Sequence, residues 1–360
     1  MTGQLSERQR EVLAAVILNY VLSGAPVGSR TVSRARSDGL SPATIRNTMS
    51  ELEELGLLLQ PHTSAGRVPS DRGYRYYVDA MMGEQPLTSG DNLTIQAALP
   101  LGGERLAVGD LLQRTVHLLA DLSCQVGVLL VPRFPQAILR RVDFHHLPGR
   151  QVLAVFVSGT GMVDHKAINS DETFTSPELE KMSALVNENF HGLTLPEIRA
   201  RLIREMHQEK DLYDRFLARG LGLFHAYLEE RGDGDDEILV DGASNVVGEA
   251  DFADVGRMKA LFRAFEEKNR LVQLLNACLD HGTTQIRIGS ECEDPIFRDA
   301  TVITAPYSYR HRAVGALGII GPRRMPYDRI VTLVDTLSQF LSDALAVRAT
   351  TGPTGDSHDG

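Results

Sequence analysis

The chain has 360 residues, of which 42% are hydrophobic and 23% charged, the composition of a globular protein with two or three domains. Acidic residues outnumber Lys and Arg by 47 to 37, and a net charge of −10 argues against coating nucleic acid or an anionic membrane with the whole surface. No apolar run reaches 18 residues and Met1 is not followed by a signal-peptide core, so we expect a cytoplasmic protein without membrane contact. The three scattered cysteines predict neither a disulfide framework nor a zinc site, and no cofactor or metal is expected.

The charge is distributed unevenly along the chain. Residues 1–82 carry nine Arg, no Lys and eight acidic residues, whereas the rest of the chain has an excess of eleven acidic residues. An all-Arg basic set suits forked hydrogen bonds to phosphates or to guanine. Because the whole chain contains 32 Arg and only 5 Lys, this composition alone carries little weight.

Residues 1–82 predict short helices followed by a hairpin and a further helix. Helices are expected after the N-cap Ser6, over residues 27–36, from the N-cap Ser41 to Gly56 and over residues 70–82, with strands at 57–59 and 67–68. Pro42 follows Ser41 at the first helical position, where a proline costs nothing. Helix, short helix, tight turn, helix and hairpin is the order of a winged helix-turn-helix.

The third of these helices has an apolar and a polar face. We expect the buried stripe to be formed by Ile45, Met49, Leu52 and Leu55. The start and the opposite face of the helix provide the candidate DNA contacts Ser41, Pro42, Ala43, Thr44, Arg46, Asn47 and Ser50. Arg46 can form a forked pair with guanine and Asn47 with adenine, while the helix start offers a hydroxyl and free N–H groups to a phosphate. From spacing alone, a solvated helix face is the alternative interpretation.

The hairpin loop and the helix after it hold further candidates for contacts with phosphates or the minor groove. These are His62, Thr63, Ser64, Arg67, Arg72 and Arg75. His62 is equally compatible with a structural role in the loop. Tyr74, Tyr76 and Tyr77 are interpreted as packing residues rather than as side chains that stack on bases.

Beyond a Gly-, Pro-, Ser- and Thr-rich linker at 83–103, the pattern is mixed α and β. Strands are expected at 126–131, 138–144, 152–157 and 162–168, and again at 238–240, 285–288, 301–304 and 313–320, with helical patterns over 176–231, up to about 280 and over 330–341. A hairpin turn is expected at 158–161. This order suggests one sheet domain split by an insertion, although two consecutive domains would give a similar pattern.

Two long motifs carry a resemblance to a known family. Ser41–Asn47 reads SPATIRN, and Gln60–Pro69, QPHTSAGRVP, is followed by GYRYYVD at Gly73–Asp79. In this order and separation they resemble the HrcA family of heat-inducible transcription repressors. Val302–Tyr307 and Gly318–Pro322 also resemble the C-terminal half of that family. The resemblance covers nearly the whole chain and is strongest over residues 5–82.

The resemblance implies an α+β multidomain fold in which a GAF-like α/β domain is split by an inserted, helix-rich dimerising domain. The expected divisions are a winged-helix DNA-binding domain at 1–82, a linker at 83–103, GAF-like parts at 104–175 and 271–347, the insertion at 176–270 and a disordered tail at 348–360. The resemblance also implies a homodimer that binds an inverted-repeat operator in double-stranded DNA and represses chaperone operons in the bacterial cytoplasm. Chaperonin would support its activity, and the bound protein would be nucleoid-associated.

Enzyme signatures are absent from the sequence. It contains no Walker loop, no Gly-x-Ser-x-Gly, no His-Glu-x-x-His and no dinucleotide-binding fingerprint. The acidic stretch Asp233–Glu237 lacks the glycine of a calcium loop, and His145 and His146 have no partner at metal spacing. The alternative to the chaperone-operon repressor is a winged-helix regulator controlled by a small molecule bound in the GAF-like domain.

Overall fold

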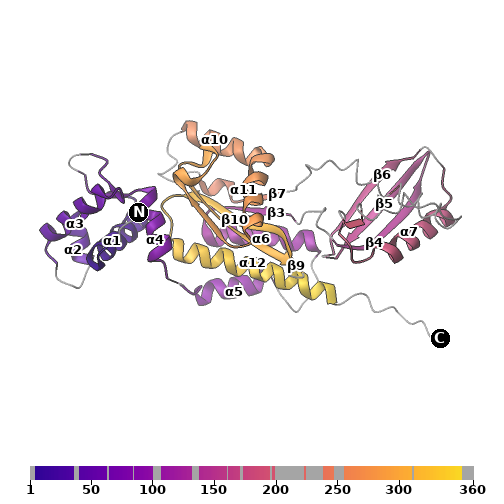
Figure 1. Ribbon diagram of the computed structural model, residues 1–360, viewed down its shortest axis with the longest axis horizontal. Helices are drawn as coiled ribbons and strands as arrows, with labels where there is room; N and C mark the ends of the chain where they lie inside the picture. The colour runs from indigo at the N-terminus through magenta and orange to yellow at the C-terminus, as the bar shows by residue number, and fades with distance from the viewer. Residues whose placement is uncertain are drawn as a thin grey trace.

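The computed structural model describes most of the chain and arranges it as an elongated, mixed α and β molecule with several units (Figure 1). The described residues are 5–35, 40–62, 65–83, 85–99, 107–131, 138–159, 161–170, 173–194, 197–198, 223, 238–246, 255–309 and 312–350. A helical N-terminal unit lies at one end, a five-stranded sheet in the middle and a three-stranded sheet at the other end. The expected acidic loop at 233–237 and the tail beyond residue 350 fall outside the described residues.

The N-terminal unit, residues 5–82, has the predicted order of elements. These are α1 (Glu7–Ser23), α2 (Ser29–Ala35), α3 (Pro42–Glu54), β1 (Leu58–Leu59), β2 (Val68–Pro69) and α4 (Asp71–Ala80). The Ser6 hydroxyl and the Gln9 side chain form the expected capping box at the start of α1. One correction concerns Leu55, which was expected in the buried stripe of α3 but is 47% exposed. It is the C-cap residue, still helical, but at about 100° per residue it lies roughly 80° around the helix from Ile45, at the edge of the buried stripe.

The expected linker at 83–103 contains a helix, α5 (Ser89–Ala98). Thr88 and Asp91 form a capping box at its start, and Ile95 is buried in the hydrophobic cluster that extends from the N-terminal unit into the central body. The Asp91 carboxylate also lies 3.0 Å from the Arg329 guanidinium. That hydrogen bond, with further bonds from Thr88, lowers the pKa of Asp91 although burial opposes the shift. The segment expected to be a linker thus contains an ordered helix that packs on the central body.

The central body is a five-stranded sheet of order β7-β3-β10-β9-β8, in which every neighbouring pair is antiparallel. Its strands are β3 (Val126–Leu130), β7 (Ile238–Asp241), β8 (Gln285–Ile288), β9 (Ala300–Tyr309) and β10 (Arg312–Pro322). Its α-helices are α6 (Val108–Ser123), α10 (Val255–Glu266), α11 (Lys268–His281) and α12 (Tyr327–Thr350). The 3-10 turns are η2 (Ala243–Val246), η4 (Gly289–Glu291) and η5 (Pro295–Phe297).

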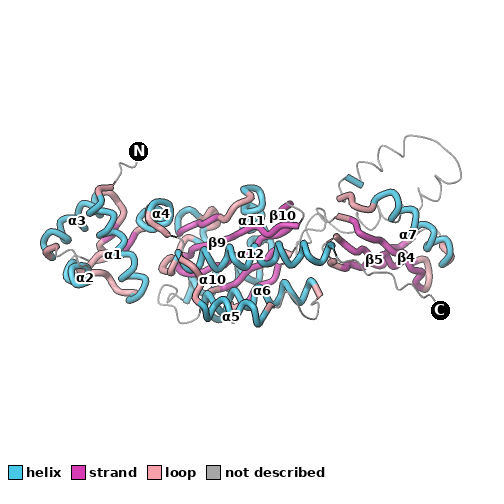
Figure 2. The backbone as a smooth tube through the Cα atoms, turned by 90° about the horizontal axis from the view of Figure 1, so that it is seen from below, coloured by secondary structure: helices cyan, strands magenta, loops and turns pink. Residues whose placement is uncertain are grey.

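Helices cover both faces of this sheet (Figures 1 and 2). Side chains alternate along β9, so that Ile303 joins the cluster under α6 and α12, whereas Val302 joins the cluster under α10 and α11. The window Tyr327–Val347 of α12 is long and apolar enough to cross a membrane. Half of it is buried, however, and Leu333 and Leu337 are fully enclosed, which identifies α12 as a core helix.

The three-stranded sheet is a separate unit with its own core. It consists of β4 (Leu139–Leu147), β5 (Gln151–Ser158), β6 (Val163–Asn169) and α7 (Ser176–Phe190). β5 and β6 pair around the expected turn, and the Asn187 amide of α7 bonds the N–H and C=O of Val142 on β4, at 2.8 and 2.9 Å. His145 and His146 are exposed in β4.

This pairing differs from the expectation that residues 104–175 belong to one domain. β3 has β10 on one side and β7 on the other, so both of its edges are occupied and β4 cannot add to it. The insertion therefore begins between residues 131 and 138 rather than at 176, and it ends before Ile238 rather than at 270. At the other end of the body, α12 continues to Thr350, beyond the expected limit at 347.

Candidate nucleic-acid interface

The N-terminus of α3 is fixed by its own cap. The Ser41 hydroxyl oxygen accepts a hydrogen bond from the Thr44 N–H at 3.2 Å and lies 2.9 Å from the Thr44 hydroxyl. Ile45 and Leu52 are fully buried in the N-terminal unit, so the rotation of α3 about its axis is determined by packing. The predicted N-cap role of Ser41 is confirmed, and its expected contact with a phosphate stays a prediction.

The face of α3 opposite the buried stripe is open. Pro42, Ala43, Arg46 and Asn47 are exposed, and Thr44 and Ser50 are partly exposed. The Ser50 hydroxyl donates to the Arg46 carbonyl at 3.2 Å, a side-chain-to-backbone bond that does not involve the Arg46 guanidinium. Within the part of the chain that the structure describes, the side chains of Arg46 and Asn47 make no recorded hydrogen bond or ion pair.

Two of the three acidic side chains of α3 are bound by neighbouring elements. The Gln9 amide of α1 donates to Glu51 at 2.9 Å. The Arg67 guanidinium donates to Glu53 at 2.9 and 2.8 Å. These contacts turn both carboxylates toward the rest of the N-terminal unit, which reduces the repulsion that an approaching phosphate would meet on α3.

The loop between β1 and β2 holds two described candidates for DNA contact, of which one is exposed and the other binds an acidic side chain of α3. His62 is exposed, and its carbonyl accepts from the Ala65 N–H at 2.9 Å. The Arg67 side chain is only 15% exposed, because it binds Glu53 and its backbone forms a bridge with Val27. Arg67 thus anchors the loop to α3, whereas the sequence analysis expected a DNA contact. Thr63 and Ser64 lie outside the described residues.

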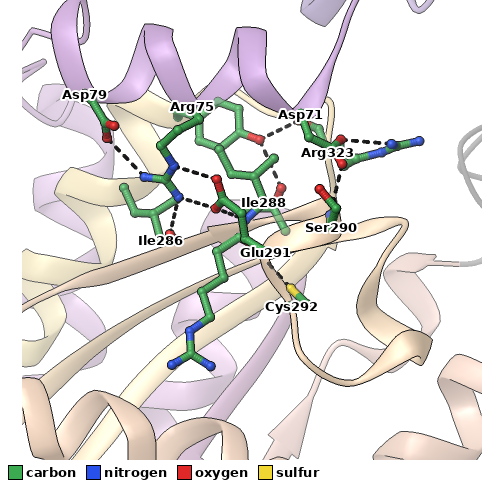
Figure 3. Close-up of polar contacts among 12 residues, drawn as sticks. Asp71, Arg75, Asp79, Ile286, Ile288, Ser290, Glu291, Cys292 and Arg323 are labelled. Atoms are coloured by element: carbon green, nitrogen blue, oxygen red, sulfur yellow. Dashed lines mark hydrogen bonds and ion pairs between the residues drawn. The ribbon is translucent and has the colours of Figure 1, made fainter. Parts of the chain in front are cut away.

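The two arginines of α4 have different surroundings. Arg72 is exposed, and its guanidinium lies against Gly56, just beyond the C-terminal end of α3. Arg75 instead reaches the central body, where its Nε atom donates to Glu291 at 2.8 Å (Figure 3). The contact with Glu291 raises the pKa of Arg75 above its ordinary value although burial opposes the shift. Arg75 therefore does not lie with the other candidates.

Two exposed arginines on α2, which packs against α3, were not among the predicted DNA contacts. Arg30 and Arg34 are both exposed, at helical i, i+4 spacing. The all-Arg composition of the segment could have pointed to them, but the whole chain prefers Arg over Lys, so composition alone did not single them out. No group of three or more metal-ligating side chains occurs among the described residues, including His145 and His146.

Comparison with known proteins assigns the family. The family model described as the HrcA protein C terminal domain matches residues 109–331. The chain is 40% identical over 341 residues to the heat-inducible transcription repressor HrcA of Geobacter sulfurreducens, which covers 95% of this chain and 98% of that protein. The chain belongs to the HrcA family. The HrcA protein of Syntrophobacter fumaroxidans is 36% identical over 344 residues, with 95% and 98% covered.

A solved structure shares the fold of this HrcA-family chain. The crystal structure of a hypothetical protein at 2.2 Å resolution aligns with a TM-score of 0.62 and 22% identity, covering 96% of this chain and 100% of that one. Family membership makes the chain a transcription repressor of heat-shock genes rather than an enzyme, and it implies DNA as a partner and a cytoplasmic location.

Proposed function

We propose that the N-terminal unit is a winged helix-turn-helix in which α3 enters the major groove and the loop between β1 and β2 is the wing. The observation that carries the proposal is the open face of α3: Arg46 and Asn47 are exposed while Glu51 and Glu53 are bound on other sides of the helix. In this arrangement Arg46 and Asn47 read bases. Pro42, Ala43, Thr44 and Ser50 lie against the groove walls, and the α3 N-terminus, His62, Thr63, Ser64 and Arg72 meet the backbone.

The proposed operator is an inverted repeat bound by a homodimer. One recognition helix reads only a few base pairs, so a long specific site requires two such helices related by two-fold symmetry. The inserted three-stranded unit, which has its own apolar core, is our candidate for the dimerising domain. The central body is the candidate GAF-like domain, and the operator-bound dimer would be associated with the nucleoid.

We also propose chaperonin support, and the order in which the central sheet must assemble favours it. β3 at Val126–Leu130 pairs with β10 at Ala316–Ile320. In the sequence, the inserted unit and much of the body separate these two strands, although they are neighbours in the sheet. Such non-local pairing is slow, and both β3 and β10 are largely buried and apolar, which makes their unpaired forms prone to aggregate. We infer that chaperonin raises the folded fraction and that heat, by diverting chaperonin to other proteins, releases the repressed genes.

The chaperonin proposal is tested by heating the purified protein, cooling it and measuring operator binding with and without chaperonin and ATP. Recovery that depends on chaperonin is the expected result. Full spontaneous recovery would contradict it and favour the small-molecule alternative.

A cavity of about 440 Å³ lies between β4 and α7, with Arg141, His145 and Glu180 in its lining. Because this cavity is in the three-stranded unit and not beside the central sheet, it does not support a ligand in the GAF-like domain.

The DNA-binding proposal is tested by footprinting the full-length protein on the chaperone promoters of its source genome. Arg46→Ala and Asn47→Ala should each weaken binding to the protected duplex by about 1–3 kcal/mol, the value of one good base contact. Arg298→Ala, which removes an exposed arginine of the central body, serves as the control and should bind like the parent. Parental affinity of Arg46→Ala would show that α3 is not the recognition helix.

A further inference from the structure

α4 belongs to the N-terminal unit and to the central body at once. On the N-terminal side, the Ser70 hydroxyl that caps α4 donates to the Gly56 carbonyl at 2.7 Å, just beyond α3. Gly73 packs so closely on the turn before β1 that a Cβ atom there would lie 2.1 Å from the Leu57 carbonyl oxygen. α4 and α3 are therefore joined through β1 and the turn before it, with little freedom between them.

The opposite side of α4 carries two charged residues one helical turn apart, and each binds the body (Figure 3). The Asp71 carboxylate accepts from the Arg323 guanidinium at 2.9 Å and from the Ser290 backbone N–H at 2.9 Å. Arg75 donates to both carboxylate oxygens of Glu291 and to the Ile286 carbonyl. Both partner segments adjoin the central sheet, since Ser290 and Glu291 belong to η4, directly after β8, and Arg323 follows the central strand β10.

The body is shaped to receive the Asp71 carboxylate. Gly289 has a φ of +55°, and a Cβ atom there would lie 2.3 Å from an oxygen of that carboxylate. Only glycine combines this backbone conformation with so close an approach. The Glu291 carboxylate is itself held, because it accepts from the Ile288 N–H at 2.9 Å. The four partly exposed side chains thus form two ion pairs whose acids are also held by backbone N–H groups of the body.

We infer that Asp71 and Arg75, through Arg323 and Glu291, are positioning residues that set the direction in which the body presents α3 to DNA. This inference rests on the proposed function of α3. A two-fold operator requires two recognition helices at one spacing and angle, so the orientation of each N-terminal unit on its body contributes to binding of the whole site. This orientation does not contribute to binding of half a site, because only one recognition helix contacts the DNA there and the angle to the second helix does not matter.

The inference makes a different prediction from a direct contact of Arg75 with DNA. If Arg75 bound a phosphate, removal of the Glu291 charge would free its guanidinium and strengthen binding, and loss of Arg75 would reduce the salt dependence of binding by about one counterion. If Arg75 positions α3, removal of the Glu291 charge weakens binding and leaves the salt dependence unchanged.

The experiment compares Glu291→Gln with the parent on two duplexes, the footprinted inverted repeat and one half of it. The glutamine keeps an oxygen for the Ile288 N–H, so η4 should survive. We expect the affinity for the inverted repeat to fall about five-fold, at the lower end of typical coupling between sites, and the affinity for the half-site to stay the same.

Asp294→Asn is the matched control, because it removes the acid that Arg270 binds at 2.7 Å elsewhere in the central body and keeps an oxygen for the Ile296 N–H. Unchanged or increased affinity of Glu291→Gln for the inverted repeat would overturn the inference, as would an equal loss on both duplexes. Failure of the proposed function is recognised separately. It would appear as parental binding by Arg46→Ala, or as a parent protein that binds both duplexes equally well.

Discussion

The two ends of the molecule are attached to the central body in different ways. The N-terminal unit shares one continuous hydrophobic cluster with α5, α6, α12 and one face of the central sheet. The three-stranded unit has a cluster of its own, built around β5 and α7. Tyr74 of α4 and Tyr327 of α12 lie at the shared junction, with ring centroids 5.6 Å apart. We therefore expect the N-terminal unit to move with the body and the three-stranded unit to unfold more independently of it.

The largest expected effects come from removing one buried ring at each end. Tyr74→Ala and Phe156→Ala each delete an aromatic side chain that is at most 2% exposed, at a cost of about 3–5 kcal/mol of unfolding free energy. Tyr74→Ala should accelerate hydrogen exchange in α4 and α12 together. Phe156→Ala should accelerate exchange in β4–β6 and leave α3 and β9 protected. If Phe156→Ala exposed α3, or Tyr74→Ala left α12 unchanged, the contrast between the two ends would be wrong.

A smaller change tests the junction at Gly289. Gly289→Ala places a Cβ atom against the Asp71 carboxylate and strains a backbone with φ +55°, which should cost about 1–3 kcal/mol. Gly282→Ala is the control, since Gly282 also has a positive φ, +68°, but nothing lies within 4 Å of its added Cβ. Thermal unfolding gives the two costs, and their difference measures the close approach of α4 to the body. Equal costs would mean that this approach contributes nothing.

The sequence predicted elements more successfully than their partners. Ser6, Ser41 and Ser70 cap the helices of the N-terminal unit because caps and apolar periods are local signals. The helix α5 also had a local signal, the Thr88 and Asp91 capping box, hidden in a stretch whose composition resembles a linker. The sheets could not be divided, because the alternation in β4 and β5 shows that these strands are half-buried but not which edge they join.

In the candidate site, too, local features could be predicted from the sequence and distant partners could not. The open face of α3 follows from helical period, so Arg46 and Asn47 could be predicted from residues near them in the chain. The partners of Arg67 and Arg75 could not. Glu53 is 14 residues from Arg67, on a different element, and Glu291 is 216 residues from Arg75. A charged residue near a recognition helix is free for DNA only if no distant acid binds it, and the sequence does not contain that information.

The anchoring role of Arg67 can be separated from a DNA contact. Arg67→Ala should lower the stability of the N-terminal unit by about 1–2 kcal/mol, because it removes hydrogen bonds to a charged, partly buried carboxylate. Arg8→Ala is the comparison: Arg8 lies 4.0 Å from Glu51 with half of its side chain exposed, and its loss should change stability by less than about 0.5 kcal/mol. Urea unfolding of the two variants measures both values. A neutral Arg67→Ala would return Arg67 to the candidate DNA contacts.

The smallest expected effect is a pH dependence of the same junction. Burial, together with the Asp328 carboxylate 3.0 Å away, raises the pKa of Tyr77 to about 12. Because this pKa lies above the value of 10 for an exposed tyrosine, the contribution of Tyr77 to stability is complete below pH 10 and disappears as the pH rises through 12. At pH 10 the loss relative to neutral pH is only about 0.4 kcal/mol, since half of the unfolded chains have ionised there. Tyr77→Phe should remove this part of the alkaline destabilisation while leaving that of the other tyrosines.

The measurement is the unfolding free energy of the parent and of Tyr77→Phe from pH 8 to 10.5. If the two free energies fell in parallel, the phenol would ionise as readily in the junction as in the unfolded chain. That result would contradict the tight attachment of α4 to α12.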